Sequence, residues 1–245
     1  MNNMLVDAGG QEIQIYSLSE RAVTISFGNE ISTSIAERIS NFNTELHKRP
    51  FSGFKTTVSA YCTLTVFYEP MDVLESGLPD QSCFDQVASY LRSIQDGNCT
   101  ERTAESGRIM IPVYYGGEFG PDLKEVSAYT NLSIDEVISL HSAAVYKVHM
   151  IGFVPGFAYL GGMDERLACM RKAQPRAAVP AGAIGIAGKQ TGIYPLETPG
   201  GWQIIGQTPL RLFEVNRSSP SLLQAGDEIM FRPVSLNEFN TLWEN

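Results

Sequence analysis

Residues whose types and spacing could carry out chemistry concentrate between positions 151 and 209, in a stretch rich in glycine and proline. This stretch holds eleven of the 22 glycines and six of the 13 prolines, so its backbone can turn tightly and approach a ligand closely. Successive N–H groups in such turns form concave sites for anions. The same composition is also typical of the bends and bulges of a small β-barrel, so composition alone leaves both interpretations open.

Charged side chains are scarce here, which singles out the few that occur. Between residues 173 and 206 only Arg176, Lys189 and Glu197 are charged. The guanidinium of Arg176, in an apolar segment framed by proline, could hold a carboxylate or phosphate in its fork or could cap a loop carbonyl. We expect Lys189 to be solvated.

One histidine near this stretch is a candidate for acid–base work. His149 lies in a strand-like pattern, where a structural role and a role as general base both remain open. His141 follows a helical pattern and is expected near a helix end. The nearby aromatic residues are predicted to form core or pocket wall: Phe153, Phe157, Tyr159, Tyr194 and Trp202.

Several common kinds of site are not indicated. In the segment Gly185–Thr191, Gln190 occupies the position of the Ser or Thr that a phosphate-binding P-loop requires. The four cysteines form no C-x-x-C pair and lie at no metal-ligand spacing with the three histidines, so we expect no metal site. Reduced thiols, and an N-terminus unlike a signal peptide, predict a cytoplasmic protein.

The charge balance also excludes some partners. Net charge is −9 and the isoelectric point about 4.9, which disfavours nucleic acid and anionic membrane surfaces. No apolar run reaches the roughly 18 residues of a membrane helix.

Residues 1–100 are predicted to form a small α+β domain. Apolar residues alternate over 12–18, 22–27, 54–60 and 61–68, as in half-buried strands, and recur with helical spacing over 31–48 and after Ser82. The order β-β-α-β-β-α indicates a two-layer domain with two helices on one face of a four-stranded sheet.

Residues 101–245 are predicted to form a β-barrel domain, joined through a polar linker at 96–107. A strand over 109–115 precedes two short helices that begin near Pro121 and Ser133, and Glu136 completes a capping box with Ser133. Beyond 150 helical patterns nearly vanish, and strands are predicted over 202–206, 210–215 and 228–231.

Three long motifs carry a resemblance to a known family. They are Gly-Phe-Val-Pro-Gly-Phe-Ala-Tyr-Leu-Gly-Gly at 152–162, Gly-Lys-Gln-Thr-Gly-Ile-Tyr-Pro at 188–195, and Pro-Gly-Gly-Trp-Gln-Ile-Ile-Gly at 199–206. The sequence resembles the KipI-like family, also called allophanate hydrolase subunit 1, over essentially its whole length. The resemblance implies an N-terminal β-β-α-β-β-α domain and a C-terminal cyclophilin-like β-barrel, in agreement with the patterns above.

The resemblance implies one component of an ATP-dependent 5-oxoprolinase, which converts 5-oxo-L-proline to L-glutamate together with an A-type subunit and a KipA-like C-type subunit. ATP with Mg²⁺ would be bound by the assembled complex, and no cofactor tightly by this chain alone. Two alternatives remain: an inhibitor of a sensor histidine kinase, and a component of a biotin-dependent carboxyltransferase similar to urea carboxylase. The chain has no Met-Lys-Met sequence, so biotin would be carried elsewhere.

With this family in view, we expect the catalytic groups to be Arg176, Gln190 and His149. Oriented N–H groups of the glycine-rich turns would stabilise negative charge that develops on an amide oxygen. The residues expected to contact substrate or nucleotide are Phe153, Pro155, Gly156, Thr191, Tyr194, Pro195, Gly200, Gly201 and Trp202.

Overall fold

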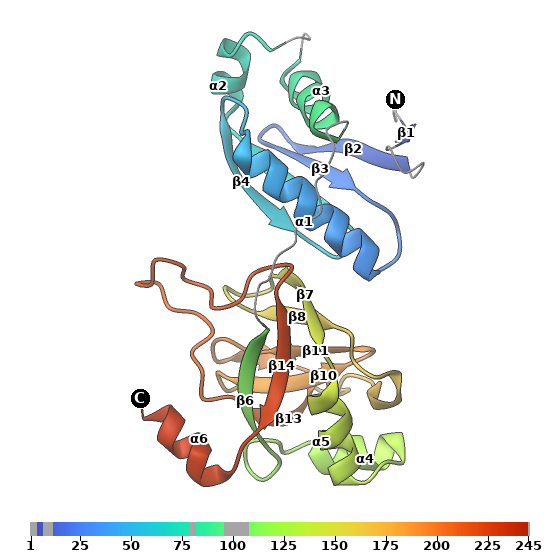
Figure 1. Ribbon diagram of the computed structural model, residues 1–245, viewed down its shortest axis with the longest axis vertical. Coiled ribbons are helices and arrows are strands. Elements are labelled where there is room, and N and C mark those ends of the chain that lie inside the picture. Colours follow the sequence, from blue (N-terminus) through green and yellow to red (C-terminus); the bar gives the residue numbers. More distant parts are fainter. Residues whose placement is uncertain (1–3, 7–11, 79–81, 96–107, 245) are drawn as a thin grey trace. The chain divides into compact units, whose positions relative to one another are not determined.

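The computed structural model describes residues 4–6, 12–78, 82–95 and 108–244 (Figure 1). The chain divides into two compact units, Met1–Ala104 and Glu105–Asn245. The predicted linker at 96–107, and the predicted boundary between residues 100 and 101, lie outside the described residues. Within the described ranges no helix has both the length and the apolar character needed to cross a membrane.

The first unit is a sheet covered by helices on one face. The antiparallel strands run in the order β1-β2-β3-β5-β4. Apolar side chains of α1 and α3, such as Phe42 and Leu91, form one core with Ile25 and Leu64 of the sheet. The bounds are β1 Met4–Val6, β2 Glu12–Ser19, β3 Ala22–Ser26, α1 Thr33–Lys48, β4 Phe54–Ser59, β5 Thr63–Tyr68, α2 Pro70–Glu75 and α3 Cys83–Gln95.

The predicted two-layer α+β domain is confirmed, with two additions. The sheet has five strands rather than four, because β1 pairs with the edge of β2. The helix α2 follows β5 directly and begins at Pro70. Both elements are too short, at three and six residues, to show a periodic pattern in the sequence.

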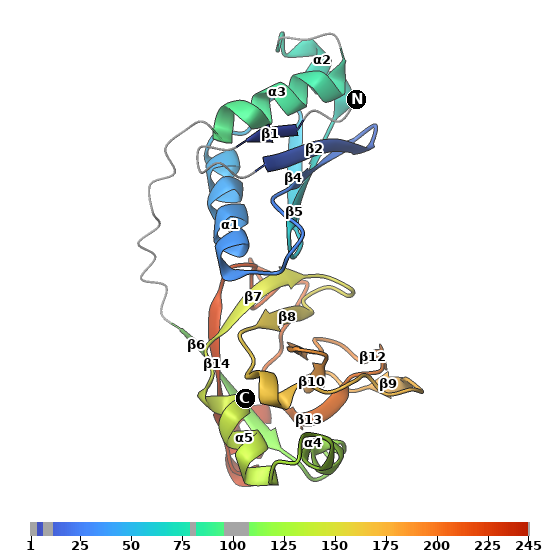
Figure 2. The ribbon, with the colours of Figure 1, turned by 90° about the vertical axis from the view of Figure 1, so that its right-hand side faces the viewer.

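The second unit is a closed barrel of seven strands in the order β10-β11-β8-β7-β14-β6-β13. All pairs are antiparallel except β6 with β14, which run parallel side by side (Figure 1). A separate ribbon, β9 with β12, lies beside β10 and β13 (Figure 2). The bounds are β6 Ile109–Tyr115, α4 Leu123–Thr130, α5 Ile134–Ala143, β7 Tyr146–Ile151, β8 Ala158–Gly161, η1 Glu165–Leu167, β9 Arg176–Val179, β10 Ala183–Ala187, β11 Gln190–Ile193, β12 Thr198–Gly200, β13 Gln203–Gln207, β14 Glu228–Pro233 and α6 Leu236–Trp243.

The barrel confirms the predicted fold class, with two local corrections. The predicted strand at 210–215 is wrong: Phe213 forms one isolated bridge with Ser221, and the segment is otherwise a loop. Its apolar pattern arises because Leu212 packs into the barrel core from that loop. The prediction that helical patterns nearly vanish beyond residue 150 also missed one helix, α6, whose first turn is capped by the hydroxyl of Ser235.

A chain of hydrogen bonds crosses the barrel interior through His141. The Nδ1 atom of His141 lies 2.8 Å from the hydroxyl of Tyr115, and its Nε2 lies 3.0 Å from the hydroxyl of Thr191. Because Thr191 donates to the carbonyl of Gly185, it accepts from Nε2–H, and Tyr115 donates to Nδ1. His141 is fully buried, and burial lowers the pKa of its imidazole from 6.5 to about 3. The ring is therefore neutral and adds no charge to the end of α5.

We expect His141→Gln to flatten the pH dependence of stability. Folded His141 stays neutral down to about pH 3, whereas the unfolded chain binds a proton below about 6.5. Stability is therefore lost as pH falls from 6.5 towards 3, by at most about 1.4 kcal/mol per pH unit for this one group. Denaturant unfolding followed by tryptophan fluorescence measures this, since both tryptophans, Trp202 and Trp243, lie in the second unit.

The matched control for this measurement is His47→Gln, because His47 is exposed on α1. It should leave the slope between pH 4 and 6 unchanged. An equal slope in His141→Gln and in the unmodified chain would contradict the assignment of a neutral buried imidazole.

Candidate functional site

The indole of Trp202 lies flat on the outer face of the barrel because two glycines leave room for it. On β10 and β11, Ile184 and Ile193 point into the barrel core, so the neighbouring Gly185 and Gly192 face outward. A Cβ added to Gly185 would come within 2.8 Å of Trp202 Cβ, and one at Gly192 within 2.9 Å of Trp202 Cζ3. Any larger residue at either position would displace the indole.

Three other rings surround Trp202 and complete an aromatic cluster, defined here as Phe157, Tyr159, Tyr194 and Trp202. The ring centroids of Trp202 and Phe157 are 5.6 Å apart, and those of Trp202 and Tyr159 are 5.8 Å apart. Phe157 also meets Tyr194 edge to face at 5.0 Å. Edge-to-face packing at these distances stabilises the cluster beyond the area that it buries. The cluster therefore forms a closely packed floor beneath the ribbon, in which Phe157, Tyr194 and Trp202 are buried.

The ribbon of β9 and β12 places several of the predicted site residues next to the aromatic cluster. Gly200 of β12 pairs with Arg176 of β9, and the Tyr194 hydroxyl lies against the Gly200 Cα with no room for a Cβ. A hydrogen bond joins Tyr194 to the backbone of Trp202. Arg176, Tyr194, Gly200, Gly201 and Trp202 are therefore neighbours.

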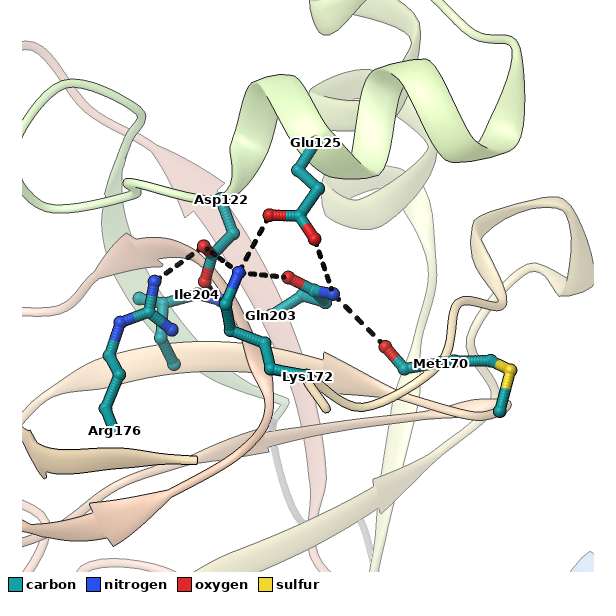
Figure 3. A network of polar contacts seen from close by, with 7 residues as sticks. All are labelled: Asp122, Glu125, Met170, Lys172, Arg176, Gln203 and Ile204. Atoms are coloured by element: carbon teal, nitrogen blue, oxygen red, sulfur yellow. Dashed lines mark hydrogen bonds and ion pairs between the residues drawn. The ribbon is translucent and has the colours of Figure 1, made fainter. Parts of the chain in front are cut away.

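Asp122 holds the ribbon against the barrel through a network of polar contacts (Figure 3). Its Oδ1 accepts from Arg176 Nη2 at 2.6 Å and from Lys172 Nζ at 3.0 Å. Its Oδ2 accepts from the backbone N–H of Ile204 at 2.7 Å. Although Asp122 precedes α4, its side chain makes no capping bond to that helix. The carboxylate is used for long-range contacts instead.

The network continues through Glu125 and Gln203. Lys172 Nζ also donates to Glu125 Oε2 at 2.7 Å, and Gln203 Nε2 donates to Glu125 Oε1 at 3.3 Å and to the carbonyl of Met170 at 3.2 Å (Figure 3). The Lys172 N–H donates to the carbonyl of Gly201 at 2.7 Å. Two segments far apart in sequence thus fix the turn that precedes Trp202.

The electrostatics of Asp122 favour its charged form. Burial alone would raise the pKa of this carboxyl, which is 4% exposed. Hydrogen bonds from Arg176, the Ile204 N–H and Lys172 outweigh burial, so the pKa lies below its ordinary value of 3.8. Asp122 is a carboxylate at neutral pH, and Arg176 is held by it.

The loop before β8 presents an exposed aromatic ring. Phe153 is 63% exposed and has a φ of 68°, a left-handed conformation that bulky residues rarely adopt. Its ring meets Phe157 edge to face at 5.7 Å. Exposed Pro155 and buried Gly156 follow, and a Cβ on Gly156 would lie 3.3 Å from Pro195 Cβ. This predicted contact surface therefore adjoins the aromatic cluster.

His149 owes its orientation to an irregularity in β7. The pairing of β7 with β8 shifts between Val148 and Met150, so His149 is the extra residue of a β-bulge. Its ring lies against the Cα of Gly161, where a Cβ would overlap it. Burial, aided by the charge of Lys147, lowers the pKa of His149 below 6.5. A neutral imidazole at neutral pH has the protonation state that a general base needs.

Two predicted residues lie on opposite faces of β11. Thr191 is fully buried in the barrel interior, where it bonds His141. Gln190, one residue earlier, faces outward with Gly192 by strand alternation. The structure thus groups Gln190 with the outer face of the barrel, whereas Thr191 is separated from it.

Sequence reasoning missed Asp122, Glu125, Lys172 and Gln203. Asp122, Glu125 and Lys172 lie outside the three motifs. Gln203 lies within the third motif, but a single polar residue in a strand does not stand out. No local pattern marks a partner 54 residues away, as Asp122 is from Arg176. Within the described ranges no group of three His, Cys, Asp or Glu residues could hold a metal ion.

Comparison with known proteins identifies the family. The family model described as carboxyltransferase domain, subdomain C and D, matches residues 13–223. The chain belongs to this family of carboxyltransferase domains, and the membership predicted from the motifs is confirmed.

The chain is also similar to individual proteins of known sequence or structure. The chain is 43% identical over 237 residues to the B-type subunit of 5-oxoprolinase from Bacillus subtilis (strain 168), a match that covers 94% of this chain and 97% of that protein. The crystal structure of TTHA0988 is similar at a TM-score of 0.75 and 33% identity, over 88% of this chain and 40% of that one. The K. lactis urea amidolyase shares the fold, with a TM-score of 0.73 at 16% identity, over 99% of this chain and 16% of that one.

We expect Asp122→Asn to lower the free energy of unfolding by about 2–4 kcal/mol, because it leaves Arg176 and Lys172 without their buried counter-charge. The lower part of that range applies because both cations are partly exposed, at 28% and 22%. Urea unfolding followed by tryptophan fluorescence provides the measurement.

Glu125→Gln is the matched control, since Glu125 bonds the same lysine but is 58% exposed. Its effect should stay below about 1 kcal/mol. Equal effects of the two substitutions would show that the buried position of Asp122 is not what matters.

Proposed function

We propose that this chain is one component of an ATP-dependent 5-oxoprolinase, which converts 5-oxo-L-proline to L-glutamate with hydrolysis of ATP. The observation that carries the proposal is the match to a B-type subunit of 5-oxoprolinase over nearly the full length of both proteins. The partners would be an A-type subunit and a KipA-like C-type subunit, and the chain would be inactive or weakly active without them. We place the complex in the cytoplasm.

The surface around Trp202 is consistent with a site for an amide substrate. Opening a lactam develops negative charge on its oxygen, and an arginine or oriented N–H groups stabilise such charge. In this proposal oriented N–H groups of the glycine-rich turns and the amide of Gln190, on the same outer face, stabilise that charge. Arg176, held by Asp122, supplies positive charge that binds the anionic substrate. His149 acts as the base because burial keeps its imidazole neutral at neutral pH.

The described residues of this chain do not fit a site for Mg²⁺. Asp122 and Glu125 are already engaged by Arg176 and Lys172, and no group of three metal-binding side chains lies elsewhere in the described ranges. In this proposal the assembled complex binds ATP and Mg²⁺.

A second candidate follows from the description of the matching family, which is that of a carboxyltransferase domain. In that case biotin would be carried by another chain, because this one has no Met-Lys-Met sequence. Transfer of a carboxyl group from carboxybiotin to an acceptor would then replace lactam opening.

The deciding measurement is 5-oxoproline-dependent ATP hydrolysis with release of glutamate. It is made with this chain alone, with the KipA-like partner, and with both partners together. We expect full activity only with the complete set. If every well-folded combination lacks activity, the proposal falls, and a carboxybiotin transfer assay tests the second candidate.

Within the complex, Arg176→Lys should reduce kcat/KM by more than about tenfold, equivalent to about 1.4 kcal/mol. Lysine keeps a positive charge beside Asp122 but lacks the planar fork of a guanidinium. Lys189→Gln is the control, since Lys189 is an exposed cation in the neighbouring turn that pairs only with exposed Glu165 among the described residues. Unchanged kinetics in a folded Arg176→Lys complex would remove Arg176 from the site.

A further inference from the structure

A second guanidinium lies on the aromatic cluster beside Arg176. The Arg171 guanidinium carbon is 5.8 Å from the centroid of the Trp202 ring, and the Arg171 side chain is exposed. A cation over an indole face is attracted to it and loses part of its conformational freedom. Arg171 is therefore oriented before any ligand arrives.

Arg171 has no acidic partner among the described residues, in contrast to Lys172 and Arg176. Lys172 pairs with both Asp122 and Glu125, and Arg176 shares Asp122. Three cations thus face two carboxylates on this surface, which leaves one excess positive charge on a chain whose net charge is −9. The unpaired charge is the one at the exposed edge of the cluster.

Arg176 adds a hydrogen-bond donor that lacks an acceptor. Its Nη2 bonds Asp122, but its buried Nη1 has no hydrogen-bond partner among the described residues. Buried donors in folded proteins almost always have a partner, so an unsatisfied one marks a place where an acceptor belongs. A carboxylate oxygen of a ligand would supply that acceptor.

The two arginines flank one turn. Arg176 pairs with Gly200, and the N–H of Lys172, the residue after Arg171, donates to the carbonyl of Gly201. Burial raises the pKa of the Tyr194 hydroxyl beside this turn, and the positive charges of both guanidiniums oppose that rise.

Trp202 itself is buried, whereas Tyr159 is partly exposed and Met170 is 71% exposed, so Tyr159 and Met170 provide the apolar surface at the edge of the cluster. The surroundings suit a small molecule with an apolar ring or short chain and a single negative charge.

We propose that Arg171 and Arg176 bind the carboxylate of a small substrate whose apolar body packs on Tyr159 and Met170, at the edge of the aromatic cluster. A carboxylate matches the guanidinium fork, and one carboxylate matches the one excess charge. If the proposed function holds, on which this assignment of the ligand rests, the molecule is 5-oxoproline, a lactam ring that bears one carboxylate. Arg171 would then determine specificity for the anionic end of the substrate.

The test uses Trp202 as the reporter. Trp243→Phe leaves Trp202 as the sole tryptophan of the full-length chain, because the sequence has two. In this background we expect 5-oxoproline to change the emission of Trp202 saturably, and 2-pyrrolidone, the same ring without the carboxylate, to have no effect. Arg171→Gln should raise the Kd at least about tenfold, and Arg171→Lys should have a smaller effect because it keeps the charge but loses the fork.

Arg211→Gln is the matched control, since Arg211 is 80% exposed on a loop of the same unit, and it should leave the Kd unchanged. An equal response to 2-pyrrolidone, an unchanged Kd in Arg171→Gln, or binding of inorganic phosphate without binding of a carboxylate would overturn the proposal. The two proposals fail separately. Binding of cyclopentanecarboxylate through Arg171 without binding of 5-oxoproline keeps the site and removes the substrate assignment. An active complex whose KM for 5-oxoproline is unaffected by Arg171→Gln keeps the function and removes the site.

Discussion

The buried carboxylate of Asp122 is the interaction on which the rest of the candidate site depends. Burying a carboxylate costs more free energy than its ion pairs return unless both of its oxygens also accept hydrogen bonds. Asp122 meets that condition with donors from three segments, namely Arg176 at the start of β9, Lys172 before it and the N–H of Ile204 in β13. Because the ribbon of β9 and β12 lies outside the barrel ladder, this contact and the aromatic packing set its position.

The hydrogen bond from Ile204 to Asp122 and the packing of Trp202 act on opposite ends of one short segment, residues 202–204. Ile204 is bound by Asp122, and Trp202, two residues earlier, is seated on Gly185 and Gly192. The segment therefore has little freedom to move independently of the barrel. A site built on such a segment keeps its geometry without a ligand, and preorganised donors stabilise developing charge with no cost of reorganisation. This is the physical reason to place the chemistry here rather than on the exposed loops.

Periodicity in the sequence predicted the two-part fold, since alternating and helical patterns mark which face of a strand or helix is buried. The capping box at Ser133 was likewise readable, because its two members are three residues apart. The sequence also predicted Arg176, Gly200 and Trp202 as site residues, and the structure places Gly200, the partner of Arg176, two residues before Trp202. The pairing of Arg176 with Asp122 was not predictable, since it joins residues 54 positions apart and depends on how the ribbon folds back. The bulge at His149 could not be predicted from the sequence either, because it is a shift in register between two strands.

One motif illustrates why a continuous pattern in the sequence need not be a continuous site. In β11 the alternation of a strand sends Thr191 into the barrel, where it accepts from His141 and donates to Gly185, while Gly192 faces Trp202. The hydrogen bond from Thr191 to the Gly185 carbonyl fixes the backbone on which Trp202 rests. The interior chain of Tyr115, His141 and Thr191 and the outer aromatic cluster therefore meet at Gly185. The interior chain thus supports the outer surface through one shared strand.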